Sequence, residues 1–477
     1  MMGGLLSLRF LTNALSKADY GLMSIINQTV LFGIILSSGG LRQSMIRFHG
    51  EYRSGGVLAK ATGTYLAWIM GLSVVGFLAL LGVFPALASF GVIPARILPA
   101  AFLACCLVIV RQGFEAFTCI YRARGEVSRV SIFALATKYV GLALIIALVT
   151  GQLLQYYQGI VLGEGLVVAV LIYLFFRKEP IRSLGYSSKL AREMFHFGIP
   201  IMSSVAIHAV FHMSNRYAIN GLMDASSVAV YSVAASLAIY ASTAIVNGFN
   251  AAMIPVIMNA WGAGEHDKAR AALTNMVRYY ALGAFPIAAG LVGVSRGLIT
   301  LLTNIKKYEA AIPIIPLVVG GAIFWGFQSA VLIGLQIGKR TRLLAALAVS
   351  MVVINLVLTC TLILLVEILG GDGLMGAAIA TFVSMVCYVV VGHVLARRYC
   401  RFPLPWLRMV QYAAAAGLML FAVTQIVFVE NWPLQLAVRI ATGIVVYVAL
   451  VLLIDGSLRK FAVERVWARA WRFFRKP

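Results

Sequence analysis

Apolar stretches of about 20 residues recur along almost the whole chain of 477 residues. A helix of this length matches the thickness of the hydrocarbon core of a bilayer. The composition agrees, because 61% of the residues are hydrophobic, 12% are charged and the mean hydropathy is +0.94. We therefore predict an all-α integral membrane protein with about 14 transmembrane helices, which leaves no room for a soluble catalytic domain.

Clusters of charged residues separate the predicted spans, and long apolar runs without strict alternation exclude the strands of a membrane barrel. The spans are predicted at residues 1–15, 21–40, 62–84, 97–121, 129–150, 157–176, 195–222, 228–252, 277–302, 312–336, 343–366, 373–396, 409–429 and 433–454.

The net charge of +23 is distributed unevenly between the two sides of this map. The even-numbered connections and the C-terminal tail hold most of the 39 Lys and Arg residues, whereas the odd-numbered connections hold only Lys17, Arg96, Arg296, Lys306 and Lys307. By the positive-inside rule both termini are cytoplasmic, and the excess charge attracts anionic lipids at the cytoplasmic face. Nucleic-acid binding is not needed to explain it.

The two halves of the chain resemble each other. Arg9-Phe10-Leu11 aligns with Arg216-Tyr217-Ala218, and Met23-Ser24 aligns with Tyr231-Ser232, at an offset of about 208 residues; the basic loops recur in register. We predict an N-terminal six-helix lobe (1–176), a basic cytoplasmic linker (177–194), a C-terminal six-helix lobe (195–396), an additional helix pair (397–454) and a basic amphipathic cytoplasmic tail (455–477). The first helix is shorter than its counterpart, so we expect either a natural start upstream of Met1 or a shortened helix.

Several basic residues fall inside predicted spans, where an unpaired charge costs about 2.5–3.5 kcal/mol or more. Arg439 lies close enough to a helix end to extend its side chain to the interface. Arg111 and Glu115 form an i,i+4 pair by spacing. Arg9 and Arg216 occupy corresponding places in the two halves and have no acidic residue within one turn.

Polar residues on the seventh span extend this pattern. Ser204, His208, His212 and Arg216 follow one another at four-residue steps and share one helix face. Two histidines without a third ligand nearby make a weak metal site, so we expect no metal and no cofactor. Together with Lys138 in the fifth span, these residues predict a positive cavity that attracts an anion, most naturally a phosphate. Arg9, Arg216, Lys138, His208 and His212 are the candidate binding residues.

Glu164 is one of two carboxylates in the hydrocarbon zone, the other being Glu115. Its repeat counterpart is the small Ala378, so the carboxylate is a candidate for coupling proton movement to transport. A structural interpretation, in which Glu164 bonds to a neighbour or pairs with Lys138, stays open.

Four segments carry a family resemblance: Asp19-Tyr20-Gly21, the stretch from Asn215-Arg216-Tyr217 to Val230-Tyr231-Ser232, residues 355–358 and residues 373–380. In order and spacing they resemble the polysaccharide-transport branch, the oligosaccharide flippases, of the multidrug/oligosaccharidyl-lipid/polysaccharide (MOP) exporter superfamily. The resemblance covers nearly the whole chain. Two features depart from the family: the short first helix, and Asn215 where many relatives have Asp.

The resemblance implies a bilobed exporter that carries a polyprenyl-diphosphate-linked oligosaccharide from the cytoplasmic to the outer leaflet of a bacterial inner membrane. It also implies that cavity arginines bind the diphosphate, which assigns this role here to Arg9 and Arg216. Transport would be driven by an H⁺ or Na⁺ gradient or by the membrane potential. Other membrane proteins of polysaccharide assembly are expected partners.

Three alternatives remain. A multidrug or organic-cation antiporter of the same superfamily needs an unpaired carboxylate in its cavity, for which Glu164 is the candidate. A membrane-embedded polysaccharide polymerase or ligase needs a long outer loop with catalytic residues, whereas the longest outer loops hold only Arg96, or Lys306, Lys307 and Glu309. A lipid scramblase needs no recognition of a sugar.

Overall fold

The computed structural model describes residues 2–178, 184–338, 340–426 and 432–460, and it is helical throughout these ranges without a strand. Within them, 12 helices are long and apolar enough to cross a membrane, or 13 if the bent helix α9 is one span. The prediction of an all-α membrane protein is confirmed, but the count of 14 is not. The missing span is α1 (Met2–Ala14), whose 13 residues make a helix only about 20 Å long.

The chain forms two compact units, each made of two segments. Unit 1 contains residues 1–232 and 348–377, and unit 2 contains residues 233–347 and 378–477. The helices that lie wholly in unit 1 are α1, α2 (Lys17–Ser37), α3 (Leu41–Ser54), α4 (Leu58–Ser89), α5 (Leu98–Ala123), α6 (Val127–Leu148), α7 (Leu153–Lys178) and α8 (Ser188–Leu222).

Three helices contribute to both units: α9 (Ala225–Gly262), α15 (Thr341–Ile368) and α16 (Gly373–Ala396). The remaining helices belong to unit 2: α10 (His266–Gly293), α11 (Ser295–Leu302), α12 (Ile305–Tyr308), α13 (Ile315–Val331), α14 (Ile333–Ile337), α17 (Trp406–Thr424) and α18 (Trp432–Ile454). Short 3₁₀ turns at Ala95–Ile97 and Glu309–Ala311 join helices.

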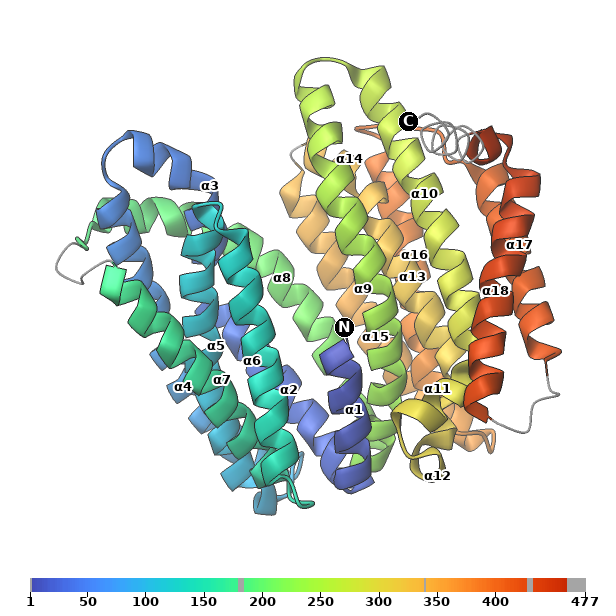
Figure 1. The fold of residues 1–477 in the computed structure, drawn as a ribbon, viewed down its shortest axis with the longest axis horizontal. Coiled ribbons are helices and arrows are strands. Elements are labelled where there is room, and N and C mark those ends of the chain that lie inside the picture. The colour runs from blue at the N-terminus through green and yellow to red at the C-terminus, as the bar shows by residue number, and fades with distance from the viewer. Residues whose placement is uncertain (1, 179–183, 339, 427–431, 461–477) are drawn as a thin grey trace, which may run out of the picture. The chain divides into compact units, whose positions relative to one another are not determined.

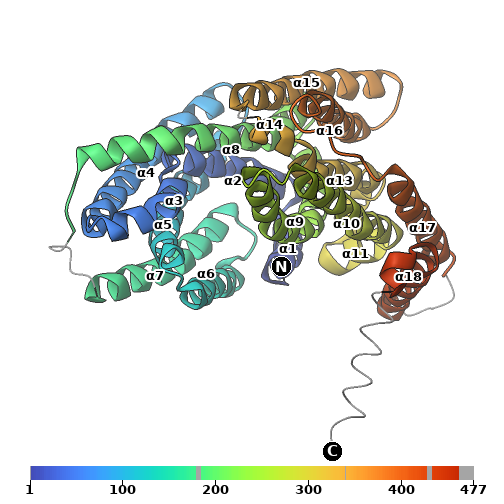
Figure 2. The ribbon, with the colours of Figure 1, turned by 90° about the horizontal axis from the view of Figure 1, so that it is seen from above.

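Unit 1 is held together by close helix packing. Helices α6 and α7 lie side by side (Figures 1 and 2), and Gly163 on α7 meets the backbone of Gly141 on α6, where an added Cβ would lie 2.6 Å from its Cα. Small residues at such crossings let backbones approach, which replaces the hydrophobic driving force that is weak in lipid. A buried cluster draws residues from each of the helices α3 to α8 and includes Tyr65, Phe117 and Phe175.

Two glycines turn the chain sharply between α2 and α3. Gly39 and Gly40 have φ of 54° and 70°, a region that other L-residues rarely adopt. A Cβ on Gly40 would lie 2.0 Å from the carbonyl oxygen of Gly198, so α8 passes directly against this turn. Ser44 on α3 also donates a hydrogen bond to the Met194 carbonyl of α8, at 2.6 Å. The first half of α8 is thereby fixed to α3.

In unit 2, the additional helix pair α17–α18 packs on α10, and a buried carboxylate joins the three helices. Asp455 follows the end of α18, is 0% exposed, and accepts hydrogen bonds from Arg278 on α10 and from Tyr412 on α17. Burial opposes ionisation of this carboxyl, but hydrogen bonds from Ser457, Tyr412 and Arg278, with the charge of Arg278, outweigh it and hold the pKa of Asp455 well below its usual range.

The predicted segment boundaries differ from the observed ones in two places. The linker predicted at 177–194 is shorter, because α8 already begins at Ser188. Helix α8 also belongs to unit 1, since it packs on α2, α3 and α4, whereas the duplication places it in the second lobe. The predicted amphipathic tail falls mostly on residues 461–477, outside the described residues. The division into two six-helix lobes stays a prediction.

Candidate functional site

The first turns of α2 and α9 touch backbone to backbone in unit 1. A Cβ added to Gly21 would lie 1.7 Å from the carbonyl oxygen of Ala225. Three residues further along α2, the Ser24 hydroxyl hydrogen-bonds the Ser232 hydroxyl at 2.7 Å. These serines are 208 residues apart, the offset of the internal duplication. The repeat alignment paired Ser24 with Ser232, but it did not reveal that the two would touch.

Arg216 on α8 completes this contact. Its Nε donates to Ser24 Oγ at 2.8 Å and its Nη1 donates to the His212 carbonyl at 2.8 Å. The residue is only 4% exposed, and no carboxylate among the described residues forms an ion pair with it. A buried guanidinium is therefore held here by a neutral hydroxyl and a carbonyl.

Asn215, the residue that departs from the family pattern, extends the polar cluster. It is 2% exposed, donates from Nδ2 to the Tyr231 hydroxyl at 3.2 Å, and accepts from Thr359 Oγ1 on α15 at 3.3 Å. An aspartate at this position would supply a negative charge beside Arg216. The neutral amide leaves the positive charge of Arg216 uncompensated. We call Ser24, Asn215, Arg216, Tyr231, Ser232 and Thr359 the Arg216 cluster.

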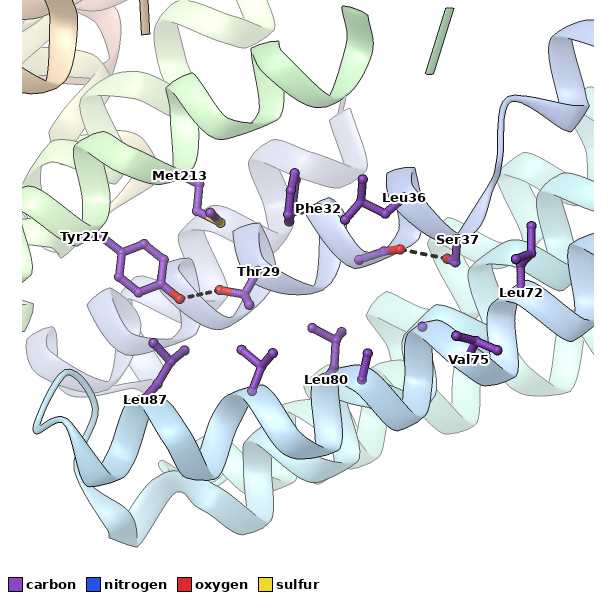
Figure 3. Close-up of a pocket in the computed structure, with 14 residues that line it drawn as sticks. Thr29, Phe32, Leu36, Ser37, Leu72, Val75, Leu80, Leu87, Met213 and Tyr217 are labelled. Atoms are coloured by element: carbon purple, nitrogen blue, oxygen red, sulfur yellow. Dashed lines mark hydrogen bonds between the residues drawn. The ribbon is translucent and has the colours of Figure 1, made fainter. Parts of the chain in front are cut away.

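An apolar groove of about 530 Å³ lies between α2, α4 and α8, next to this cluster. Figure 3 shows Phe32 and Leu36 of α2 above Leu80 and Leu87 of α4, with Met213 and Tyr217 of α8 at one end. There the Tyr217 hydroxyl hydrogen-bonds Thr29 Oγ1 at 2.7 Å (Figure 3). Arg216 and Tyr217 both hydrogen-bond α2, at Ser24 and at Thr29, so the groove ends near the buried cation. No pattern in the sequence singles out this groove, because its walls come from three helices.

The histidines lie on α8 as their spacing predicts. His208 Nδ1 lies 2.9 Å from the Ser204 carbonyl, and the His212 ring packs edge-on against Phe211 with centroids 5.4 Å apart. His212 reaches the Arg216 cluster through its carbonyl rather than its ring. No group of three or more His, Cys, Asp or Glu residues in the described ranges is arranged to hold a metal ion.

Arg9 and Lys138 lie elsewhere in unit 1, on the neighbouring helices α1 and α6. Arg9 is exposed and lines a cavity of about 570 Å³ with Leu142 and Ile146 of α6. Lys138 is one turn before Leu142, and its aliphatic part packs against Gly3 of α1, where a Cβ would lie 2.9 Å from its Cε. Arg9 and Arg216 thus have unlike surroundings, and no contact joins them among the described residues.

The expected Arg111–Glu115 pair is corrected by the structure. Arg111 on α5 donates from Nε and Nη2 to both carboxylate oxygens of Glu164 on α7, at 2.8 and 3.0 Å. Glu115 instead pairs with Arg42 at 3.3 Å and Arg122 at 3.5 Å. A two-pronged contact between packed helices has better geometry than an i,i+4 contact on one helix, which explains the exchange of partners. Glu164 therefore has Arg111, not Lys138, as its partner.

Three solved structures share this fold at low sequence identity. A multidrug resistance MATE family transporter of the MOP superfamily, in an inward-facing conformation, has a TM-score of 0.68 at 14% identity over 83% of this chain and 94% of its own. The lipid II flippase MurJ, in an inward closed conformation, has a TM-score of 0.61 at 16% identity over 96% and 97% of the two chains. A MOP superfamily transporter from Pyrococcus furiosus Vc1 (DSM3638) has a TM-score of 0.56 at 14% identity over 84% and 92%.

The chain therefore shares its fold with these two MOP superfamily transporters and with MurJ. No curated protein sequence matches the chain significantly. The model of a family described as polysaccharide biosynthesis protein matches residues 10–313, which is more than half of the chain and includes the Arg216 residue and the Arg111–Glu164 pair. The chain belongs to this family of polysaccharide biosynthesis proteins.

Proposed function

We propose that this protein is a flippase that moves a polyprenyl-diphosphate-linked oligosaccharide from the cytoplasmic to the outer leaflet of a bacterial inner membrane. The observation that carries the proposal is the buried Arg216, which has no carboxylate partner among the described residues and adjoins the apolar groove through Tyr217. Family membership and the fold support the same assignment.

The diphosphate is the part of this substrate that cannot cross hydrocarbon unaided, because burying an isolated charge costs tens of kcal/mol in the Born limit. Arg216 offers a guanidinium whose present acceptors are the Ser24 hydroxyl and the His212 carbonyl. A phosphate oxygen makes a stronger charge-assisted bond than a neutral hydroxyl and so displaces it. Arg9 and Lys138 would contact the head group at another stage of transport, because their side chains are exposed whereas Arg216 is buried.

The polyprenyl chain needs an apolar path beside the head-group site. The groove between α2, α4 and α8 supplies one, and from Thr29 to Ser37 it follows about 12 Å of α2. Head group and chain would then lie on adjoining surfaces of α8. Export is favoured by an inside-negative potential, which is worth about 2.3 kcal/mol per charge per 100 mV for an anion moving outward.

The organic-cation antiporter is the weaker alternative on the geometry. Its binding site requires an unpaired carboxylate, whereas the carboxylate of Glu164 accepts hydrogen bonds from Nε and Nη2 of Arg111. A drug-resistance screen with the overexpressed protein tests this alternative directly.

The test of the proposed function is flipping of a lipid-linked oligosaccharide in proteoliposomes. Arg216→Ala should lower the rate at least tenfold, because it removes the buried cation. Arg439→Ala is the matched control, since Arg439 also lies in a predicted span but donates to the Ile426 carbonyl, at 3.0 and 2.8 Å, away from the groove. Equal rates for the two variants would refute the role of Arg216.

A further inference from the structure

A second, larger cavity of about 1160 Å³ opens between α3, the start of α4 and the start of α8. Figure 1 shows α3 and the beginning of α8 at the same end of unit 1. The charge distribution of the loops predicts that this end is cytoplasmic. We call this cavity the basic pocket, because its lining includes Lys60, Lys189, Arg192 and His196.

The carboxylates of the basic pocket have hydrogen-bond or ion-pair partners, whereas its Lys and Arg side chains have none among the described residues. Glu51 is paired with Arg47 at 2.8 Å, and Glu193 accepts a hydrogen bond from the Tyr52 hydroxyl at 3.5 Å. By contrast, the side chains of Lys60, Lys189 and Arg192 have no hydrogen-bond or ion-pair partner within the described residues. The lining of the pocket therefore contains positive charges that have no partner among the described residues.

Aromatic side chains also line the basic pocket. Phe48 packs edge-on against Phe197 with ring centroids 5.2 Å apart, and its centroid lies 5.8 Å from that of Tyr52. Tyr52 belongs to the buried cluster of α3 to α8, against which Phe48 packs. A pocket lined by both cations and aromatic rings suits a ligand that carries both phosphate and apolar or sugar surface.

The basic pocket and the apolar groove are built on the same helices. The groove uses α2, α4 and α8, and the pocket uses α3, which continues α2 after the glycine turn, together with the first turns of α4 and α8. Side chains of α4 and α8 meet near both cavities. Trp68 packs edge-on against Phe195 with centroids 5.1 Å apart, and Phe195 and the groove residue Leu72 both flank Gly39.

We propose that the basic pocket is the loading site for the phosphorylated head group of the polyprenyl-linked substrate, occupied before the chain enters the groove. The occupant follows from charge complementarity and from continuity with the groove, because a polyprenyl diphosphate places its anion next to a long apolar chain. The inference rests on the proposed function and adds an earlier site to it, distinct from Arg216.

The test measures binding of a radiolabelled polyprenyl diphosphate to the full-length protein in phosphatidylcholine nanodiscs. Lys189→Gln combined with Arg192→Gln should weaken binding about tenfold or more, since each charge-assisted bond to phosphate is lost. The matched control is Arg397→Gln combined with Arg398→Gln, two exposed basic residues of unit 2 on the side predicted to be cytoplasmic. This control should leave the affinity unchanged.

Glu193→Gln distinguishes a loss of binding from a loss of folding, because this variant is expected to bind the polyprenyl diphosphate more tightly than the wild-type protein does. Removing this carboxylate from the pocket removes repulsion of the diphosphate, so binding should tighten severalfold. The uncharged polyprenol should bind much more weakly than the diphosphate, and phosphatidylglycerol at equal mole fraction should not compete.

Two outcomes overturn the loading site while leaving the proposed function intact. In the first, the wild-type protein flips the lipid-linked oligosaccharide, but the pocket variant binds as tightly as the control. In the second, phosphatidylglycerol competes equally, which makes the pocket a general site for anionic lipids. If the wild-type protein neither binds the polyprenyl diphosphate nor flips the oligosaccharide, the proposed function fails, and the loading site fails with it.

Discussion

Replacing Glu164 with Gln leaves the guanidinium of Arg111 in the membrane-spanning region without its counter-ion. Breaking a fully buried ion pair from one side costs about 3–5 kcal/mol, whereas an exposed pair contributes less than about 1 kcal/mol. The side chains of Arg111 and Glu164 are 32% and 14% exposed, between these limits. We therefore expect Glu164→Gln to lower the free energy of unfolding by about 2 kcal/mol.

The double variant Arg111→Gln with Glu164→Gln should recover most of this loss, because it removes both charges together. Its free energy of unfolding should lie within about 1 kcal/mol of the wild-type value. The measurement is a denaturant titration of the four proteins of the cycle in detergent micelles. Lys268 and Glu265 provide a control cycle, since the side chains of this i,i+3 pair are 74% and 47% exposed and should show coupling below about 0.5 kcal/mol. A double variant as unstable as Glu164→Gln would refute the pair.

The same double variant tests whether Glu164 has only a structural role or also couples proton movement to transport. If Glu164 carries protons during transport, the stable double variant should lose flipping driven by a pH gradient and keep flipping driven by a potential. Proteoliposomes with an imposed gradient or an imposed potential measure the two separately. If the double variant responds to a pH gradient as the wild-type protein does, Glu164 has no role in coupling proton movement to transport.

Two further predictions concern the groove and the C-terminal helix pair. Val75→Trp fills the groove from an exposed wall position and should lower flipping severalfold, whereas Val74→Trp, on an exposed residue outside the groove, should leave it near the wild-type rate in the same assay. Because the pKa of Asp455 is held below its unfolded value of about 3.9, its stabilisation is present above pH 4 and is lost as the pH falls through the folded value. Asp455→Asn should therefore cost about 3 kcal/mol at pH 7, and thermal unfolding of this variant should depend less on acid than that of the wild-type protein.

The sequence predicts those features of the fold that depend on one helix at a time. Span positions, the short α1 and the face shared by His208, His212 and Arg216 all follow from local composition and the helical period. The duplication also aligns Ser24 with Ser232 before any contact is known. These features need no information about how helices rotate against one another.

The sequence does not predict which residues of different helices contact one another. The partner of Arg111 depends on which face of α7 packs on α5, and an i,i+4 carboxylate on the same helix was the only partner that spacing offered. The packing of the first half of α8 depends on the contact of Gly198 with Gly40, two glycines far apart in the chain. The groove could not be predicted either, because in the sequence each of its walls is an ordinary apolar helix face. Tertiary packing decided all three.

Charge balance in the buried interior favours Arg216 over the other candidate residues as the proposed anion site. Among the described residues, Arg216 and Asp455 are the only Arg, Lys, Asp or Glu side chains that are buried. Asp455 is met by Arg278, so its charge is compensated, whereas Arg216 is met by hydroxyl and carbonyl oxygens alone.

A net charge in this position is expensive unless an anion arrives to balance it. The Ser24 hydroxyl accepts a charge-assisted bond from the guanidinium, and such bonds are worth about 1.5–3 kcal/mol. In the proposed function a diphosphate oxygen would add the attraction of opposite charges to this bond and displace the hydroxyl, and Ser24 would give the guanidinium an acceptor again when the substrate leaves.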